Sequence, residues 1–211
     1  MSTAHCLFRP MVRGLLVVAC IALTAGCSPK YVFEPEDVRA IAKDVSALPT
    51  DQAVTAIVNT LNARYPGKIK TDLHWIFNYT GGTLGQMAIL YASLDEYVLI
   101  FGTPIGAEGF SGRYAKMDVY DCMFAGEMWT YLEGQLEKTV YKPGDCAILN
   151  RGEAKGYWMK ENTWMLEYTR GFIPASLPIG AFAPFNLTRD WHNLWNVLSD
   201  YGSLVIRSFF D

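Results

Sequence analysis

Apolar residues recur at every third or fourth position in two short segments after residue 34, which is the spacing of one buried helix face. The first segment opens with Pro35 and ends at Pro49; the second begins near Thr50 and ends before Pro66. The apolar positions are Val38, Ile41, Val45 and Leu48 in the first segment, and Val54, Ile57, Val58 and Leu61 in the second. We expect two amphipathic helices that pack on the domain that follows.

From residue 73 the pattern changes to short runs rich in aromatic and β-branched residues, separated by turn residues. In residues 86–93 and 96–103 both alternating faces are apolar, which indicates strands that are covered on both sides. Many short strands at close spacing predict a small barrel or sandwich. Strands are expected near residues 73–79, 86–93, 96–103, 117–124, 126–132, 138–141, 145–149, 155–159 and 163–169. A loop is expected at the glycines Gly102, Gly106, Gly109 and Gly112.

Helical spacing returns near the C-terminus, after an apolar segment at residues 175–182. Thr188 is a suitable N-cap, and apolar residues then recur at three or four with a thin polar face. Trp191 and Trp195 suit the headgroup depth of a membrane, which favours a helical pair at a membrane interface. An ordinary amphipathic pair that closes the core explains the pattern equally well.

The N-terminal segment from Gly14 to Gly26 is uncharged and mostly apolar, and Arg9 and Arg13 precede it. Three interpretations are open: a short transmembrane or signal-anchor helix, the apolar region of a cleaved signal peptide, or a bacterial lipoprotein signal with Cys27 as the lipidated residue. All three place the rest of the chain at a membrane. We therefore divide the chain into an anchor or signal segment, residues 1–29, and a domain, residues 30–211.

Composition narrows the function further. Charged residues make up only 18% of the chain and hydrophobic residues 51%, which suits a domain that meets lipid or an apolar ligand. The net charge is −3 and no basic block is present, so a nucleic-acid partner is not expected. Three scattered histidines predict no metal site, and the glycines form no nucleotide-binding motif, so no cofactor is expected. Cys122 and Cys146 are interpreted as two buried thiols.

The acidic residues within apolar runs are the candidates for chemistry. Strand alternation puts Glu167 on a face with threonines, which favours a solvent-facing position, whereas a buried position would raise its pKa and allow proton donation at neutral pH. Asp118 and Asp121 point to opposite faces of one predicted strand, so one of them faces inward. Two facing carboxyls in an apolar barrel would supply a proton donor and acceptor. Glu96, expected to hold a hairpin, and Glu153, expected in a loop, are rivals.

These residues resemble a known family, the sterol C-8 isomerases and the sigma-1 receptor. The resemblance runs from about Tyr31 to the C-terminus, and the order and spacing of its motifs are nearly those of the family. The motifs are Trp75-Ile76-Phe77 with Gly81-Gly82, Gly85-Gln86-Met87 with Leu90, Ala92-Ser93 with Glu96-Tyr97, Phe101-Gly102-Thr103, Gly112-Arg113-Tyr114, and Asn162-Thr163-Trp164-Met165 with Glu167-Tyr168, Arg170-Gly171 and Ile173-Pro174.

The resemblance implies an α+β fold: an N-terminal membrane helix, a metal-free cupin-like β-barrel at about residues 73–170, and a membrane-adjacent helical pair at about 175–210. It also implies the site. Glu167 corresponds to the buried glutamate of the family, Asp121 to the acidic residue that faces it, and Asp118 to an acidic position found in both branches. The ligand-binding positions that it implies are Met87, Ile89, Tyr97, Leu99, Phe101, Val119 and Glu167 itself.

The chain departs from the family at Tyr91, where a histidine is usual, and at Thr83, which replaces a pocket tryptophan of the sigma branch. One residue is inserted between Tyr114 and Asp121, which leaves the acidic register open by one position. The Leu-Thr-Ala-Gly-Cys sequence that ends at Cys27 hints at a bacterial relative.

We therefore expect an isomerase that moves a sterol double bond from C8 to C7, using Glu167 with Asp121 or Asp118. The alternative is a receptor-like protein that binds cationic amphiphiles, sterols or lipids without turnover. The resemblance further suggests homotrimers and association with a membrane. That membrane would be the endoplasmic reticulum in a eukaryote, or the bacterial envelope if Cys27 is lipidated.

Overall fold

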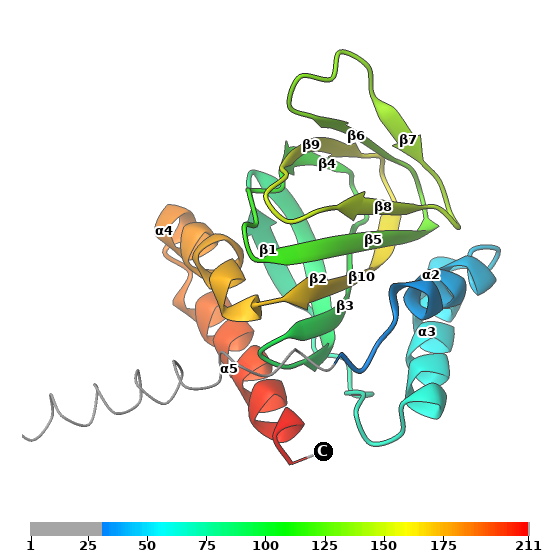
Figure 1. Cartoon of the computed structure of the whole chain (residues 1–211), viewed down its shortest axis with the longest axis vertical. Coiled ribbons are helices and arrows are strands. Elements are labelled where there is room, and N and C mark those ends of the chain that lie inside the picture. Colours follow the sequence, from blue (N-terminus) through cyan, green and yellow to red (C-terminus); the bar gives the residue numbers. More distant parts are fainter. Residues whose placement is uncertain (1–30, 211) are drawn as a thin grey trace, which may run out of the picture. The chain divides into compact units, whose positions relative to one another are not determined.

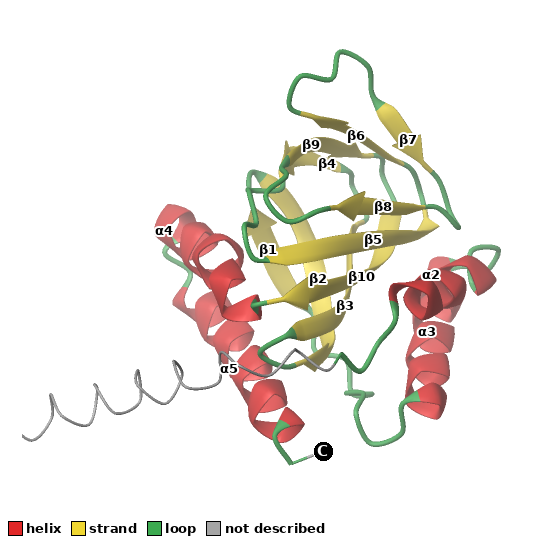
Figure 2. Cartoon of the chain, viewed as in Figure 1, coloured by secondary structure: helices red, strands yellow, loops and turns green. Residues whose placement is uncertain are grey.

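The computed structural model describes residues 31–210 as helices packed on antiparallel strands (Figures 1 and 2). Two helices come first, α2 (Pro35–Asp44) and α3 (Thr50–Arg64), at the positions that the apolar periodicity predicts. The strands are β1 (Ile76–Thr80), β2 (Thr83–Ala92), β3 (Glu96–Thr103), β4 (Ala107–Phe110), β5 (Met117–Ala125), β6 (Met128–Leu132), β7 (Thr139–Tyr141), β8 (Cys146–Leu149), β9 (Lys155–Met159) and β10 (Thr163–Gly171). The chain ends with η1 (Ile173–Ser176), η2 (Pro178–Phe182), α4 (Ala183–Thr188) and α5 (Trp191–Ser208).

The strands form two antiparallel sheets that do not close into the β-barrel implied by the family resemblance, which corrects that part of the prediction. The first sheet has the order β1-β2-β3-β10-β5-β8 and the second the order β4-β9-β6-β7, and within residues 31–210 their ladders do not join into one ring. The chain leaves one sheet for the other at a turn after β5, where Gly126 has a φ of +75°. A Cβ at Gly126 would collide with Thr163, so this change of sheet requires glycine.

The six-stranded sheet is covered on both faces, as the apolar pattern of β2 and β3 predicts. Its outer face, which includes Leu166 and Tyr168, packs on α2 and α3. Its inner face, which includes Leu99 and Met165, shares a second core with residues of the other sheet and of α5. Figure 1 shows α2 and α3 on one side of the strands and α4 and α5 on the other. A charged side chain on β10 is therefore enclosed whichever way it points.

Strand β4 corrects the prediction of a glycine loop. It pairs with β9, and its residue Gly109 lies opposite Tyr157. A Cβ on Gly109 would lie 2.0 Å from Thr83 Oγ1 and 2.8 Å from the Gly81 carbonyl oxygen. Glycine is therefore present because β2 and β4 approach closely, and not because the segment is a turn.

The C-terminal helix begins later than predicted. Its N-cap is Asp190, whose Oδ1 accepts a hydrogen bond from the Asn193 amide at 2.9 Å. Thr188 instead ends α4, where its hydroxyl donates to the Pro184 carbonyl at 2.9 Å. Arg189, with a φ of 57°, separates the two helices. Both residues can cap a helix, and the left-handed backbone at Arg189 makes Asp190 the cap of α5.

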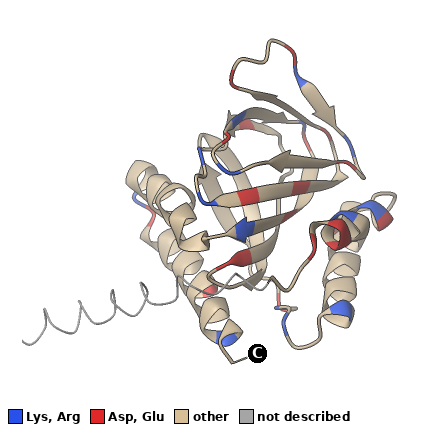
Figure 3. Cartoon of the chain, in the orientation of Figure 1, with Lys and Arg blue, Asp and Glu red and all other residues tan. Residues whose placement is uncertain are grey.

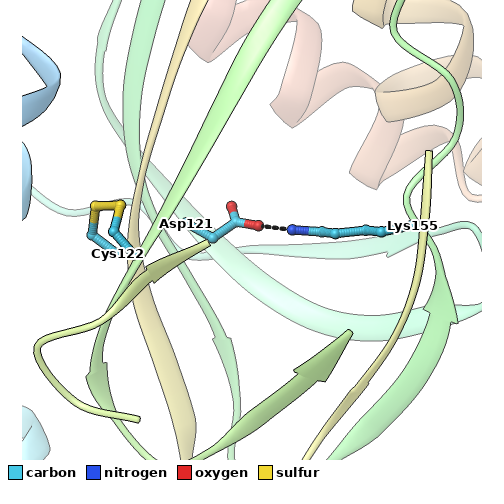
Figure 4. Close-up of a disulfide and its surroundings, with 4 residues drawn as sticks. Asp121, Cys122 and Lys155 are labelled. Atoms are coloured by element: carbon cyan, nitrogen blue, oxygen red, sulfur yellow. Dashed lines mark hydrogen bonds and ion pairs between the residues drawn. A yellow bond between two sulfur atoms is a disulfide. The ribbon is translucent and has the colours of Figure 1, made fainter. Parts of the chain in front are cut away.

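Cys122 and Cys146 form a disulfide, which corrects their interpretation as separate thiols. The two residues are direct cross-strand partners in β5 and β8, although they lie 24 positions apart in sequence. Their side chains lie on the helix side of the sheet, opposite to Asp121, the preceding residue (Figure 4). Counting cysteines could not reveal this pairing, because it depends on the register between the two strands.

The predicted anchor or signal segment, including Cys27, lies outside the described residues. Within residues 31–210 no helix is both long and apolar enough to cross a membrane.

Candidate functional site

A cavity of about 150 Å³ lies within the second core. Residues of both sheets line it. The segment from η1 to η2 contributes Ile173, Leu177 and Gly180, and α5 contributes Val197 and Tyr201. The residues that the family resemblance assigned to ligand binding all line this cavity, namely Met87, Ile89, Tyr97, Leu99, Phe101, Val119 and Glu167. Most of the lining surface is apolar, and its ionisable side chains other than tyrosines are Asp121, Lys155 and Glu167.

Glu167 lies in the middle of β10, between Leu99 of β3 and Asp121 of β5. Its Oε1 accepts a hydrogen bond from the Tyr97 hydroxyl at 2.5 Å. The surface that the side chain retains faces the cavity. The prediction from strand alternation alone, a solvent-facing position, is wrong because helices cover the opposite face and the threonine face is the inner one.

Burial, and after it the negative charge of Asp121, raise the pKa of Glu167 to about 7. The hydrogen bond from Tyr97 and the positive charge of Lys155 act in the opposite direction on this pKa. A carboxyl group with a pKa near 7 is protonated in a large share of molecules at neutral pH, so Glu167 can donate a proton there.

Asp121 lies directly opposite Glu167 in the β5–β10 ladder. Its Oδ2 accepts a hydrogen bond from Lys155 Nζ, and Figure 4 shows the two side chains extended toward each other from different strands. The side chains of Asp121 and Lys155 keep only 8% and 7% of their surface exposed. Because Lys155 belongs to β9, this ion pair crosses from one sheet to the other.

Lys155 is a site residue that sequence reasoning missed. It lines the cavity together with Tyr157, two positions further along β9, while Met159 continues the same buried face. A lysine on the apolar face of an alternating strand was the signal that could have identified it, because lysine is almost never fully buried unless it is paired.

Asp118 lies away from Glu167, three positions before Asp121 on β5. Its carboxylate accepts hydrogen bonds from Arg151 Nη2 at 2.6 Å, from Nε at 3.2 Å and from the Arg151 amide at 2.9 Å. The hydrogen bond from the Arg151 side chain lowers the pKa of Asp118. The structure thus brings Asp121, and not Asp118, to Glu167.

Three tyrosines surround the carboxyl pair. Tyr97 donates to Glu167, and Tyr114 and Tyr157 line the same cavity. Burial raises the pKa of Tyr97 well above its usual value, and it likewise raises the pKa of Tyr114 and of Tyr157. The three phenols are therefore neutral at physiological pH and offer hydroxyl groups and aromatic faces to an occupant.

The rival glutamates have structural contacts. Glu96 accepts hydrogen bonds from the Val32 amide at 2.5 Å and from the Tyr168 hydroxyl at 2.9 Å, so it fastens the segment before α2 to the sheet. The predicted hairpin role holds for its backbone, whose carbonyl accepts from the Ser93 amide at 2.8 Å, and not for its carboxylate. Glu153 is in a loop, as predicted, where it accepts from the Asn150 amide.

Among solved structures, a cupin superfamily protein from Desulfitobacterium hafniense DCB-2 is similar to 40% of this chain over 74% of its own length, at 19% identity and a TM-score of 0.36. A predicted oxalate decarboxylase from Thermotoga maritima covers 49% of this chain with 97% of its own length, at 14% identity and a TM-score of 0.40. KdgF from Halomonas sp. covers 41% of this chain with 78% of its own, at 20% identity and a TM-score of 0.37.

Two curated proteins are similar over more of the sequence. Sigma non-opioid intracellular receptor 1 of Danio rerio is 36% identical over 214 residues, which is 97% of this chain and 96% of that protein. C-8 sterol isomerase erg2 of Aspergillus fumigatus is 38% identical over 169 residues, which is 78% of this chain and 70% of that protein. The family described as ERG2 and Sigma1 receptor like protein matches residues 11–211. The chain therefore belongs to the family of C-8 sterol isomerases and sigma-1 receptors.

Proposed function

We propose that this protein is an isomerase that moves a sterol double bond from C8–C9 to C7–C8. The observation that carries the proposal is the position of Glu167, a carboxyl with a pKa near 7 that opens into an apolar cavity and has a second carboxyl, Asp121, directly opposite. The reaction is a proton relocation without net oxidation, so a proton donor and a proton acceptor meet its chemical needs.

In the first step, protonated Glu167 gives its proton to C9. The electrons of the C8–C9 double bond form the new C9–H bond, and C8 becomes a carbocation. In the second step, the C7–H bond breaks, its electrons form the C7–C8 double bond, and its proton goes to the Asp121 carboxylate. Transfer of that proton to Glu167 across the β5–β10 ladder, directly or through one water molecule, restores the starting state.

The cavity is suited to the cation that this sequence of steps creates. The ionised Glu167 is left beside the positive charge, and the faces of Tyr97, Tyr114 and Tyr157 add cation–π attraction. The apolar remainder of the lining disfavours bulk water, which would otherwise add to the cation as a nucleophile.

A sterol requires this cavity to open further. Its volume of about 150 Å³ is below the roughly 300–1,000 Å³ of common small-molecule sites. The strands are held by their ladders, whereas η1, η2 and α5 line the cavity without belonging to a sheet. We therefore propose that these C-terminal elements move to admit the substrate.

Complementation of a yeast strain that lacks its own C-8 isomerase tests the function, with the sterol profile as the readout. Wild type should restore Δ7 sterols, Glu167→Gln should not, and Glu153→Gln should serve as a matched control on an exposed loop. Absence of Δ7 sterol from well-expressed wild type would overturn the isomerase proposal.

A receptor-like binding protein is the second candidate. An ionised Glu167, enclosed by aromatic rings, is a site at which the ammonium group of a cationic amphiphile can pair. Binding of a radiolabelled hydrophobic amine to purified protein that shows no sterol turnover would favour this candidate over the isomerase. Loss of that binding in Glu167→Gln would locate the amine in the same cavity.

We also propose that the domain works at a membrane surface. Helices α4 and α5 carry few charges (Figure 3), and Trp191 and Trp195 are each 71% exposed on one face of α5. Vesicle flotation of residues 30–211 should be weakened by replacing both tryptophans with serine, and not by Leu136→Ser, a change at a 99% exposed leucine between β6 and β7. Unchanged flotation in the double tryptophan variant would refute this orientation.

The assignment to the endoplasmic reticulum or to a bacterial envelope, and the homotrimer, remain proposals that rest on family resemblance. Analytical ultracentrifugation of the detergent-solubilised protein tests the trimer, which predicts a single species of three chains.

A further inference from the structure

Lys155 is the one ammonium group within the described residues that lines the cavity, and it is hydrogen-bonded to Asp121 rather than to Glu167. It reaches the site from the second sheet, and Ser111 fixes its backbone: the Ser111 amide donates to the Lys155 carbonyl at 3.0 Å, and the Ser111 hydroxyl accepts from the Lys155 amide at 2.9 Å. The lysine backbone is therefore anchored independently of the carboxyl that its side chain meets.

Two facing carboxyls without a cation would share a single proton between equivalent positions. Lys155 removes this equivalence, because its ammonium group contacts only one of the two. Coulomb attraction in a site of low polarity strongly favours negative charge on the carboxyl next to the ammonium. Glu167, hydrogen-bonded to a neutral phenol and facing the negative charge of Asp121, is the better place for the proton.

We propose that Lys155 is a positioning residue that assigns the roles of the two carboxyls, holding Asp121 as the carboxylate and leaving the proton on Glu167. This inference rests on the proposed isomerase function for its meaning, since it names Glu167 as donor and Asp121 as acceptor. It does not rest on that function for its test, because proton positions can be measured without a substrate.

The charged and titratable groups that face Glu167 come from four parts of the chain. They are Tyr97 of β3, Asp121 of β5, Lys155 and Tyr157 of β9, and Tyr114 between β4 and β5. The tyrosines stay neutral through the physiological range, so Asp121 and Lys155 are the groups of this set that supply charge next to Glu167. Variants of these two residues should therefore account for its titration.

The experiment is an NMR titration of ¹³C-labelled glutamate side chains in the intact protein, with the Glu167 signal identified by its loss in Glu167→Gln. In Lys155→Met the two carboxyls lose their counter-ion, and the upper titration step of the pair should rise by at least about one pH unit, a tenfold change in proton affinity. Lys155→Arg keeps the charge and should leave that step near its wild-type position.

Asp121→Asn should shift the Glu167 titration in the opposite direction, to lower pH. It removes the neighbouring negative charge and leaves the ammonium group without its partner, so the Glu167 titration should fall by at least about one pH unit. Adding Lys155→Met to Asp121→Asn should raise it again, because the freed ammonium group is gone. A lysine with a merely structural role would not produce shifts of opposite sign that cancel in the double variant.

The double variant also protects the experiment against a failure to fold, because removing both members of a buried ion pair is commonly tolerated when removal of one is not. A Glu167 titration that is the same in Asp121→Asn with and without Lys155→Met would overturn the inference. If the titration shifts occur as expected but the protein does not isomerise sterols, the inference about Lys155 holds and the proposed function fails. If wild type isomerises sterols but the shifts are absent, the proposed function holds and the inference about Lys155 fails.

Discussion

Two glutamates on opposite faces of the same sheet, Glu96 fully buried and Glu167 partly exposed to the cavity, show how similar surroundings can serve different purposes. Glu96 points to the helix-covered face and Glu167 to the cavity. Burial raises the pKa of both, and a tyrosine hydroxyl donates to each, Tyr168 to Glu96 and Tyr97 to Glu167.

The difference lies in the remaining partners. Glu96 also accepts two backbone amides, from Val32 and Phe33, so its oxygens are occupied by the protein itself. Glu167 has one phenol donor and a like charge opposite, and its side chain lines the mostly apolar cavity. A buried acid with every position filled holds the fold together, whereas one with positions left open can exchange a proton with an occupant.

The largest effect on turnover is expected when Glu167 is replaced by a residue that cannot donate a proton. Glu167→Gln should lower sterol turnover by about 10²- to 10⁴-fold, the usual contribution of a general acid, while the melting temperature stays the same or rises because a buried ionisable group is gone. Turnover of purified protein and thermal melts measure both quantities. Retention of more than a tenth of wild-type turnover would show that Glu167 is not the donor.

Removing the disulfide should affect stability without touching the cavity side. Replacing Cys122 and Cys146 together by serine opens a loop of 24 residues, and the chain-entropy relation gives a loss of about 3 kcal/mol in the free energy of unfolding. The Glu167 titration should not move, because the disulfide lies on the helix side of β5. Urea unfolding measures the loss, and a displaced titration would mean that the two faces are coupled.

Substitution of Glu96, whose oxygens all have donors in the protein, should change stability and not turnover. Glu96→Gln keeps the shape but replaces an acceptor of three hydrogen bonds by an amide, which we expect to cost about 1–3 kcal/mol of stability. Hydrogen exchange at the Val32 and Phe33 amides should rise, and turnover per folded molecule should remain near that of wild type. A selective loss of turnover in a stably folded variant would contradict the division between the two glutamates.

The pH dependence of turnover should follow the titration of Glu167. Its pKa is raised from the ordinary 4.5 to about 7, so the protonated donor is lost as the pH rises through 7. Turnover should then fall about tenfold for each further pH unit. Stability follows the same sign: the contribution of this group is fully present below pH 4.5 and is lost as the pH rises to about 7. A turnover profile that stays flat from pH 6 to 9 would exclude Glu167 as the acid.

The smallest effect is expected at Asp118. Its partner Arg151 is half exposed, so Asp118→Asn should lower the free energy of unfolding by at most about 1 kcal/mol. Turnover should stay within about twofold of wild type. Asp118 does not line the cavity, and general-acid effects require contact with the substrate. Steady-state kinetics of Asp118→Asn and Asp121→Asn, measured side by side, provide the matched comparison. A large loss at Asp118 would mean that the acidic residues had been assigned in the wrong order.

Periodicity predicted most of the strands and both helices before β1, because these elements bury one or two regular apolar faces. It placed Gly109 in a loop, since a close approach between β2 and β4 leaves no trace in a sequence beyond the glycine itself. It also could not pair Cys122 with Cys146, which depends on strand register.

The inward position of Glu167 came from family resemblance and not from alternation. In a sheet covered on both faces, the polar member of a strand can point to a cavity as easily as to water. Lys155 escaped notice for the related reason that its partner, Asp121, is 34 positions away on the other sheet.

The link between β5 and β8 also bears on where this chain matures. Disulfides persist in the secretory pathway, the bacterial periplasm and the cell exterior, and are rare in a cytosol kept reduced by glutathione and thioredoxin. We therefore expect a domain in which Cys122 stays joined to Cys146 to mature in an oxidising compartment. On the cytosolic side the same fold would carry two thiols, and the choice of host compartment for the yeast experiment would decide which form is assayed.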